Sequence, residues 1–576
     1  MQRWFPILDW ARRYDGAVLA ADLLAAVIVT IMLIPQSLAY AMLAGLPPEV
    51  GLYASTLPLL AYAVFGSSRT LAVGPVAVVS LMTASAVAPI VASGLADALT
   101  AAIALAALSG VMLVAMGLLR LGFLANFLSH PVISGFITAS GLLIAAGQLR
   151  HILGIKGGGE TLPVILTALW QGIGAINAAT LAVGGAVLAF LYIARRYAKG
   201  WLKGAGLPPA LADAIARAAP VMAIAATILA TGAFDLAGRG VALVGAIPRG
   251  LPVPGLPALS LPLLLALAPA AALIAIVGFV ESVSVAQTLA AKRRERIVPD
   301  QELVGLGAAN IAAAFASGYP VTGGFARSVV NFDAGARTPA AGVFTAIGIA
   351  LATLFLTPLL ADLPQATLAA TIILAVLSLV DLPAISRTWR YSRSDFAAML
   401  TTIAVTLLWG VERGITAGVL ISLGLHVWRT SRPHSAVVGQ VPGTEHYRNI
   451  DRHQVLTDPA ILSLRVDESL YFANARFLED RIATLTACRP ALRHVVLMCP
   501  AVNMIDASAL ESLEEINRRL RDAGIRFHLS EVKGPVMDRL RRTDFLTHLS
   551  GSVFLSQHEA IRTLREAGPQ PGAPAP

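Results

Sequence analysis

Cysteine is scarce in this 576-residue sequence, which contains only Cys488 and Cys499. Two cysteines in one polar stretch of chain match neither a disulfide framework nor a metal cluster. Other chemical signatures are missing as well, because no nucleophile–base pair, phosphate-binding loop or metal-ligand spacing appears. The sequence therefore gives little support to an enzyme and predicts no cofactor and no metal site.

Charge is scarce too, since 13% of the residues are charged whereas 56% are hydrophobic, and the mean hydropathy is +0.72. A chain of this length with that composition is too apolar for an ordinary soluble protein. No segment before Leu19 resembles a cleaved signal, so the first apolar run is itself expected to cross the bilayer. The sequence predicts a polytopic membrane protein.

The formal net charge of +9 belongs to the first part of the chain. Up to Pro433 there are 26 Lys and Arg against 17 Asp and Glu, whereas residues 436–576 hold 17 of each sign. Basic loops on the cytoplasmic side of a membrane explain such an excess. The pI of 9.8 therefore does not indicate nucleic-acid binding.

Fourteen apolar stretches are long enough to cross the roughly 30 Å hydrocarbon core. An even number places both termini on one side, and a cytoplasmic N-terminus leaves only Arg150, Lys156, Arg239, Arg249 and Arg413 facing outward. We expect a multi-pass inner-membrane protein with cytoplasmic termini. The stretches lie near residues 17–42, 50–65, 70–92, 98–119, 123–148, 177–194, 215–234, 263–289, 300–317, 319–335, 338–360, 363–381, 395–411 and 413–430.

The sequence after Arg432 has the mixed polar character of a soluble domain. AILSLRVD and RHVVLMC have strand patterns, while ARFLEDRIATLTA and ASALESLEEINRRLRDAG have helical spacing. The final GPQPGAPAP cannot bury a core. We predict a transmembrane domain over residues 1–433, a cytoplasmic α/β domain over residues 434–566 and a disordered tail over residues 567–576.

The third and tenth spans are interrupted in a related way. TLAVGPVAVVSLMTA contains Gly74-Pro75, and SGYPVTGGFARSVVN contains Pro320 and Gly323-Gly324. Each break would place the free N–H groups of a half-helix at membrane depth, where they attract anions. Broken helices at corresponding positions of two halves indicate a transporter's binding site. The alternative is that these residues serve only close helix packing or kinks.

Arg327 lies just inside the tenth span. A guanidinium there costs on the order of 2.5 to 3.5 kcal/mol unless it is paired or hydrated. An anion in a cavity would supply the partner. Alternatively, Arg327 snorkels to a cytoplasmic interface or pairs with an acid such as Asp333.

Glu281 is the one carboxylate deep within an otherwise apolar span, and Ser284 and Thr288 share its helical face. A buried glutamate can exchange a proton during transport or bind a cation such as Na⁺. The alternative is a fixed salt bridge or hydrogen bond between helix bundles. Asp22 and Glu302 lie near span ends, where capping and interfacial roles are more common.

Gln36 and Tyr40 lie one turn apart in IPQSLAYAMLAGLPPEVGLYAS. If Pro35 opens the helix beside the two half-helix tips, Gln36 offers a donor and an acceptor to a polar substrate. Alternatively, Gln36 bonds to the carbonyl that Pro35 leaves free.

Long stretches of the chain resemble the SulP family, the sulfate permeases and related anion transporters that include pendrin and prestin. These stretches are PQSLAYAMLAGLPPEVGLYAS, VGPVAVVSLM and NIAAAFASGYPVTGGFARSVVNFDAGARTPAAG. The tail is similar to a STAS domain, and NMIDASALESL resembles its strand-to-helix loop.

The resemblance implies two inverted seven-span repeats, a core and a gate domain, a dimer, and anion movement by an elevator-like motion. The implied site lies between spans 3 and 10, beside spans 1 and 8. Glu281 and Ser284 would couple an ion, H⁺ or Na⁺. The substrate contacts would be Gln36, Tyr40, Val76, Ala77, Gly324, Phe325, Ala326 and Arg327.

The chain also departs from the family. Many members read GSFSR where this chain has Gly324-Phe325-Ala326-Arg327, so two hydroxyls are absent. Some bacterial members have a carboxylate in place of the neutral Gln36. In the STAS loop, Ser508 matches the position that anti-sigma factor antagonists phosphorylate, although it also suits the first turn of a helix.

We therefore expect secondary active transport of a small anion, either sulfate or a similar oxyanion, bicarbonate or a dicarboxylate. An exchanger or an uncoupled channel is the alternative within transport. A membrane-anchored STAS signalling protein is the alternative of another class. The expected partners are the anion, the bilayer, a second copy and a cytoplasmic protein bound to the STAS domain, with no nucleic acid.

Overall fold

The computed structural model describes residues 5–126, 129–159, 161–206, 208, 212, 215–216, 218–245, 250–252, 254–255, 259–378 and 380–566. The chain divides into two compact units, Met1–Ser422 and Leu423–Pro576, and each is considered by itself. The predicted outward-facing Arg249 and the predicted disordered tail, residues 567–576, lie outside the described residues.

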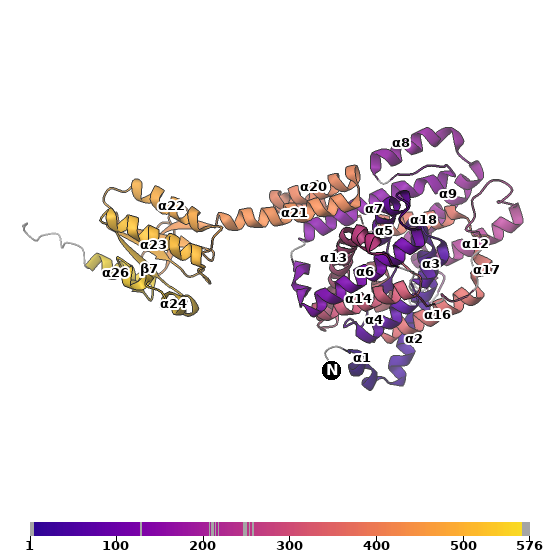
Figure 1. The fold of residues 1–576 in the computed structure, drawn as a ribbon, viewed down its shortest axis with the longest axis horizontal. Helices are drawn as coiled ribbons and strands as arrows, with labels where there is room; N and C mark the ends of the chain where they lie inside the picture. Colours follow the sequence, from indigo (N-terminus) through magenta and orange to yellow (C-terminus); the bar gives the residue numbers. More distant parts are fainter. Residues whose placement is uncertain are drawn as a thin grey trace, which may run out of the picture. The chain divides into compact units, whose positions relative to one another are not determined.

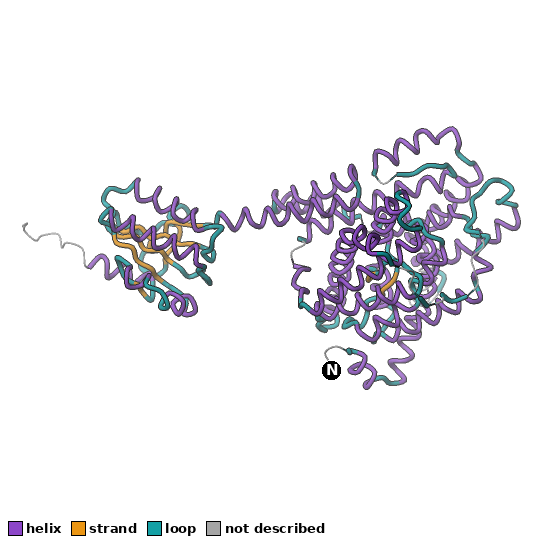
Figure 2. The backbone as a smooth tube through the Cα atoms, viewed as in Figure 1, coloured by secondary structure: helices purple, strands orange, loops and turns teal. Residues whose placement is uncertain are grey.

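The first unit is almost entirely helical (Figures 1 and 2). Asp15, Asp97 and Ser260 each accept a hydrogen bond from the first turn of the helix that follows them. The helices are α1 Ile7–Trp10, α2 Gly16–Leu43, α3 Pro48–Tyr53, α4 Leu57–Phe65, α5 Ala77–Ala92, α6 Ala98–Leu118, α7 His130–Leu153, α8 Leu162–Gly172, α9 Ala178–Ile193, α10 Lys199–Gly204, α12 Ala219–Phe234, α13 Leu261–Lys292, α14 Pro299–Phe315, α15 Phe325–Asp333, α16 Ala340–Phe355, α17 Thr357–Leu360, α18 Gln365–Leu377, α19 Leu382–Tyr391, α20 Arg393–Trp409 and α21 Val411–Ser431, the last of which runs on into the second unit.

Six helical stretches in the described part of the chain are long and apolar enough to cross a membrane, and four shorter apolar helices accompany them. The count of fourteen spans therefore stays a prediction. The long stretches are Gly16–Leu43, Ala98–Leu118, His130–Leu153, Ala178–Gly204, Leu261–Lys292 and Gln365–Tyr391.

The proposed opening of the first span at Pro35 is wrong. The helix is not opened at Pro35, because α2 continues through this buried residue to Leu43. The buried side chains around Pro35 hold the turn in spite of the missing N–H donor. The predicted second span, near residues 50–65, contains two helices, since α3 ends at Tyr53 and α4 begins at Leu57.

The second unit contains a six-stranded sheet with helices on both faces (Figure 2). The strand order is β4-β3-β5-β6-β7-β8, in which β5 to β8 are parallel and β3 is antiparallel to both of its neighbours. The elements are β3 Ser435–Gln440, β4 Tyr447–Asn449, β5 Ile461–Val466, α22 Ala475–Ala487, β6 His494–Met498, α23 Ala507–Asp522, β7 Arg526–Ser530, α24 Gly534–Leu540, α25 Phe545–His548, β8 Val553–Phe554 and α26 Gln557–Glu566.

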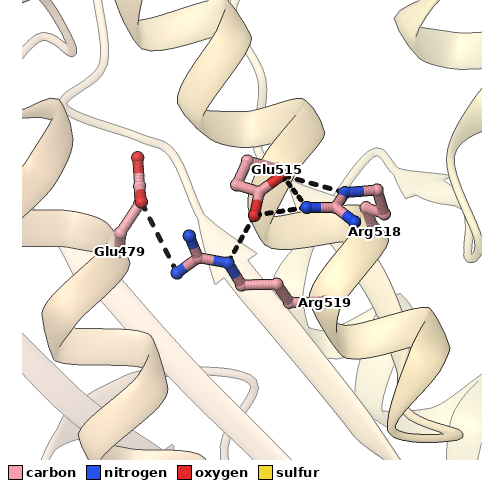
Figure 3. Close-up of polar contacts among 4 residues, drawn as sticks. All are labelled: Glu479, Glu515, Arg518 and Arg519. Atoms are coloured by element: carbon pink, nitrogen blue, oxygen red, sulfur yellow. Dashed lines mark hydrogen bonds and ion pairs between the residues drawn. The ribbon is translucent and has the colours of Figure 1, made fainter.

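The predicted strands and helices of this unit are confirmed as β5, β6, α22 and α23. An ion-pair network joins the two helices on their outer side (Figure 3). Arg519 contacts Glu515 at 2.5 Å on its own helix and Glu479 at 3.7 Å on α22, while Arg518 also pairs with Glu515. Because the arginine side chains are 59% exposed, the network contributes little to stability.

Candidate functional site

Two short strands meet within the helical unit at the predicted breaks of the third and tenth spans. Val73–Gly74 forms β1 and Thr322–Gly323 forms β2. They pair antiparallel, so that Val73 is opposite Gly323. Helix α5 starts three residues after β1, and α15 starts two residues after β2. The pairing therefore brings the N-termini of two half-helices together, as the paired breaks predict.

Neither half-helix has a side-chain cap. Val76 and Gly324 occupy the N-cap positions of α5 and α15, and neither side chain bonds to the first turn. The first four N–H groups of an α-helix have no partner within it. Each tip therefore presents backbone donors and the positive end of a helix dipole, which is the arrangement that binds anions.

Arg327 lies on the first turn of α15 and is only 2% exposed. Its Nη1 donates to the carbonyl oxygen of Pro75. Its Nε and Nη2 are buried and have no hydrogen-bond partner among the described residues. Because the side chain is buried, the alternative that it snorkels to an interface is excluded. Because an unsatisfied buried charge is costly, we expect water or a bound anion to accept from these two donors.

Glycines give the guanidinium its space. A Cβ atom on Gly324 would lie 3.0 Å from Arg327 Nη2, and one on Gly74 would lie 3.4 Å from the same atom. Gly74 also has φ +156°, which other residues rarely adopt. A side chain at Gly324 would crowd the guanidinium, whereas one at Gly74 would meet it at ordinary contact distance but would strain the backbone.

A cavity of about 50 Å³ lies in front of the two tips. At roughly 15 Å³ for each water, it holds a few waters or one small ion. The structure brings together every residue predicted to contact the substrate, and it adds Val78 and Ala375. The predicted residues in the lining are Gln36, Tyr40, Val76, Ala77, Gly324, Phe325, Ala326, Arg327 and Glu281.

Glu281, from α13, lines this cavity and also a smaller apolar one behind it. Its carboxylate makes no hydrogen bond or ion pair with the rest of the described chain, so a fixed salt bridge between helix bundles is excluded as its role. Ser284, predicted as its companion, is exposed and does not line the cavity. The buried hydroxyl on this stretch belongs instead to Ser282.

Gln36 and Tyr40 approach the cavity from α2. Neither side chain bonds to another group in the described residues, so Gln36 does not compensate the carbonyl near Pro35. Tyr40 is 7% exposed, and its ring forms part of the buried wall. Both side chains therefore have polar atoms available to a ligand bound in the cavity.

A set of buried polar contacts holds the strands, and the sequence analysis did not find it. Ser282 accepts from the Gly323 N–H at 2.9 Å and lies 2.6 Å from the Thr322 hydroxyl. Asn310 of α14 bonds to both the N–H and the carbonyl of Val321, each at 2.9 Å. The only sequence signal was the presence of polar residues in apolar helices. These contacts fix the position of β2.

Ser328 secures the other strand, because its hydroxyl accepts from the Ala72 N–H at 2.9 Å. The Gly324 N–H also donates to the Ala72 carbonyl at 3.1 Å. The start of α15 is therefore tied to the segment that leads into α5.

Comparison with known proteins identifies the chain. A model of the sulfate permease family matches residues 19–402. The chain belongs to the sulfate permease family. A STAS domain model matches residues 452–560, within the second unit. Family members are transporters, so the expectation that the protein is not an enzyme is confirmed.

Relatives cover nearly the whole chain of this family member. It is 36% identical over 574 residues to sulfate transporter 4.1, chloroplastic, of Arabidopsis thaliana, covering 97% of this chain and 82% of the relative. It is 34% identical over 565 residues to probable sulfate transporter MT1781 of Mycobacterium tuberculosis, covering 98% of each. The fold is similar to that of the murine Solute Carrier 26 family member A9 anion transporter in the inward-facing state, with a TM-score of 0.86 and 23% identity. The match covers 98% of this chain and 94% of that structure.

Two other acids of this family member have structural roles, as their places near span ends predict. Glu302 is fully buried and accepts from Tyr62, from the backbone and side chain of Ser67, and from the backbone of Ser68. Asp22 accepts from the backbone of Arg337 and from Thr338. Both carboxylates accept hydrogen bonds from the protein, whereas the Glu281 carboxylate accepts none from the described residues.

The STAS loop of this family member places Ser508 on the first turn of α23, where it is exposed. Asp506 is the N-cap and accepts from the Ala509 N–H at 2.9 Å. Ser508 therefore does not cap the helix, and its hydroxyl is accessible. Phosphorylation of Ser508 stays a prediction.

Proposed function

We propose that the protein moves a small anion across the membrane by secondary active transport and that the anion binds at the tips of α5 and α15. One observation carries this proposal: the buried Arg327 guanidinium has two unpaired donors in a cavity where two uncapped half-helices meet. An anion there would satisfy Nε and Nη2 and would accept from the backbone donors of both tips.

Sulfate is the first anion to test, because the relatives named above are sulfate transporters. Ala326 supplies no hydroxyl, so recognition would rest on Arg327, backbone N–H groups, Gln36 and Tyr40. Such a donor set suits any small oxyanion. Bicarbonate and dicarboxylates therefore belong in the same assay.

Glu281 is proposed to couple transport to H⁺ or Na⁺. Its carboxylate shares the cavity with Arg327 and has no partner in the described protein. A proton or cation would balance its charge when the anion compensates Arg327. Net transport would then require the anion and the coupling cation to be bound together.

The wider assembly is proposed as well. Alternate exposure of the site would come from an elevator-like motion of the segment that carries β1, β2 and both tips. The excess of basic residues in predicted inner loops supports cytoplasmic termini in an inner membrane. A homodimer, and a cytoplasmic partner of the STAS domain, complete the proposal.

Counterflow in proteoliposomes tests the proposal. Sulfate, bicarbonate, chloride and fumarate are each offered with and without a gradient of Na⁺ or H⁺. We expect one anion class to exchange and its uptake to follow one of the gradients. The double variant Glu281→Gln, Arg327→Ala should abolish both the anion exchange and the uptake that follows the gradient. Unchanged uptake in that double variant would contradict the assigned roles, and electrogenic flux independent of any driving ion would identify a channel.

A further inference from the structure

A second cavity, of about 610 Å³, lies in the first unit and shares no lining residue with the anion site. Its walls come from the chain start, the loop after α4, the end of α13 and the start of α14. All of these segments belong to the described residues of Met1–Ser422. The proposed transport mechanism gives this space no role.

The cavity is lined by three arginines, Arg69, Arg293 and Arg296. Two acids also line it, but each has a basic partner. Glu295 pairs with Arg69 at 3.3 Å, and Asp9 pairs at 3.5 Å with Arg13, which lies outside the lining. Among the described residues, Arg293 and Arg296 make no ion pair with a carboxylate, although the charges of Glu295 and Asp22 act on Arg293 from nearby. The cavity has a net positive charge and should bind an anion.

Most guanidinium donors around the cavity are available. Each arginine has five N–H donors. Arg69 uses Nη1 for Glu295, and Arg296 is exposed and bonds to no other group of the described chain. A phosphoryl group has the geometry that guanidinium forks bind in a bidentate manner.

The edge of the cavity is apolar and aromatic. Trp10 lines it and donates from Nε1 to the Ala63 carbonyl at 3.3 Å. Val298, an apolar residue of the same lining, is 45% exposed. Tryptophan beside exposed apolar residues and arginines is typical of the bilayer interface. A soluble anion gains nothing from this apolar edge, whereas acyl chains would cover it.

We propose that this cavity binds the phosphoryl headgroup of an acidic phospholipid, with Arg69 and Arg296 on the phosphate and the acyl chains against Trp10 and Val298. Basic pockets between membrane helices are known to bind such headgroups. The shared chemistry is a phosphate ester, so free phosphate must be distinguished from lipid by experiment.

Arg293 connects this cavity to the other end of α15. Its Nη1 donates to the Ala336 carbonyl at 2.6 Å, its Nη2 to the Phe332 carbonyl at 3.4 Å, and its guanidinium lies 4.5 Å from the Phe332 ring centre. Arg293 therefore satisfies carbonyl groups at the C-terminal end of the half-helix whose N-terminal end carries Arg327.

The experiment uses the full chain in detergent, with native mass spectrometry to count retained lipid and titration to measure affinity. The probes are phosphatidylglycerol, phosphatidylcholine of the same acyl chains, and inorganic phosphate. The test variant combines Arg69→Gln with Arg296→Gln. The matched control combines Arg239→Gln with Arg390→Gln, which removes two exposed arginines outside the cavity.

We expect the wild-type protein and the control to retain phosphatidylglycerol in preference to phosphatidylcholine. The test variant should bind phosphatidylglycerol more weakly, by about fivefold for each arginine removed. Equal affinity in the test and control variants would overturn the proposal, as would equal retention of the two lipids. Saturation by inorganic phosphate without selective lipid retention would show that the cavity binds a soluble anion, and it would overturn the proposal of a lipid site. No transport is measured, so these outcomes are independent of the proposed function.

Discussion

Arg327 and Pro75 are joined by a hydrogen bond from a guanidinium nitrogen to a carbonyl oxygen, although 252 residues separate them in the sequence. The bond ties the arginine of one half-helix to the segment that leads into the other. It uses Nη1 and leaves Nε and Nη2 unpaired. The arginine is therefore both a structural link and a free donor pair, and its substitution should affect both properties.

Arg327→Gln should lower the initial rate of anion uptake at least about tenfold, because charge-assisted hydrogen bonds are each worth roughly 1.5 to 3 kcal/mol. Arg327→Lys should be intermediate, since it keeps the charge but loses the planar fork. The measurement is uptake by proteoliposomes with matched protein content. Arg239→Gln, an exposed change of the same charge, should transport normally, and equal uptake by it and by Arg327→Gln would contradict the role of Arg327.

Glu281 and Glu302 should respond differently to substitution. Glu302→Ala removes the acceptor of four hydrogen bonds and should lower the free energy of unfolding by several kcal/mol, at about 1 to 3 kcal/mol for each buried donor left unpaired. Glu281→Ala should lower it much less, because no protein group bonds to this carboxylate. Thermal unfolding of the purified variants measures the contrast, and equal losses would show that Glu281 has a structural role.

Gly324→Ala should raise the KM for the transported anion without preventing folding. The new Cβ would lie 3.0 Å from Arg327 Nη2 and would displace the guanidinium. Gly185→Ala is the matched control, because this helical glycine has no neighbouring atom within 4 Å of the added Cβ. Concentration-dependent uptake gives KM for each variant. An unchanged KM in Gly324→Ala would mean that the guanidinium does not set affinity.

The STAS unit should lose stability as the pH falls from about 6.5 to about 4. His528 Nδ1 accepts from the Ser552 N–H at 3.0 Å, and its Nε2 lies 3.1 Å from His494 Nδ1. Burial, helped by the nearby positive charges of His494 and Arg526, lowers the pKa of His528 to about 4.

The direction in which the stability changes with pH follows from the lowered pKa of His528. Between pH 6.5 and 4 the unfolded state binds more protons than the folded state, so stability is complete above about pH 6.5 and decreases as the pH falls. The loss is roughly 3 kcal/mol for this histidine. Both cores of the unit lie within residues 436–564, so urea unfolding of a 434–566 fragment measures it. His528→Gln should flatten the profile and His453→Gln, an exposed control, should not; identical profiles would refute the assignment.

Much of the site was predictable because its chemistry is local in sequence. Gly74-Pro75 and Gly323-Gly324 each lie between an extended segment and a helix. Such breaks are costly in a membrane unless the backbone is buried in protein or lines a cavity. An arginine beside one break indicated an anion. The predicted contacts line one cavity for this reason.

The remainder depended on tertiary packing. Ser284 and Ser282 lie on the same apolar helix, and periodicity alone favoured Ser284 because it shares the helical face of Glu281. The structure instead turns Ser282 toward Thr322, which β2 brings into place. Likewise, α2 runs through Pro35 because packed neighbours outweigh the lost hydrogen bond. Neither result follows from local sequence.

The most direct test asks whether the transported anion sits on the tips of α5 and α15. Ala326 is exposed on the first turn of α15, so Ala326→Cys would place a thiol at the proposed contact. Cys488 is exposed and is first replaced by Ser, whereas burial raises the pKa of the Cys499 thiol to about 12 and keeps it unreactive.

The measurement is the rate at which a membrane-impermeant thiol reagent labels Ala326→Cys, with Ser93→Cys, an exposed site after α5, as the control. We expect the anion that is active in counterflow to slow labelling of Ala326→Cys, with the same half-saturation as transport, and to leave labelling of Ser93→Cys unchanged. Labelling of Ala326→Cys at one rate with and without that anion would contradict the proposed binding site.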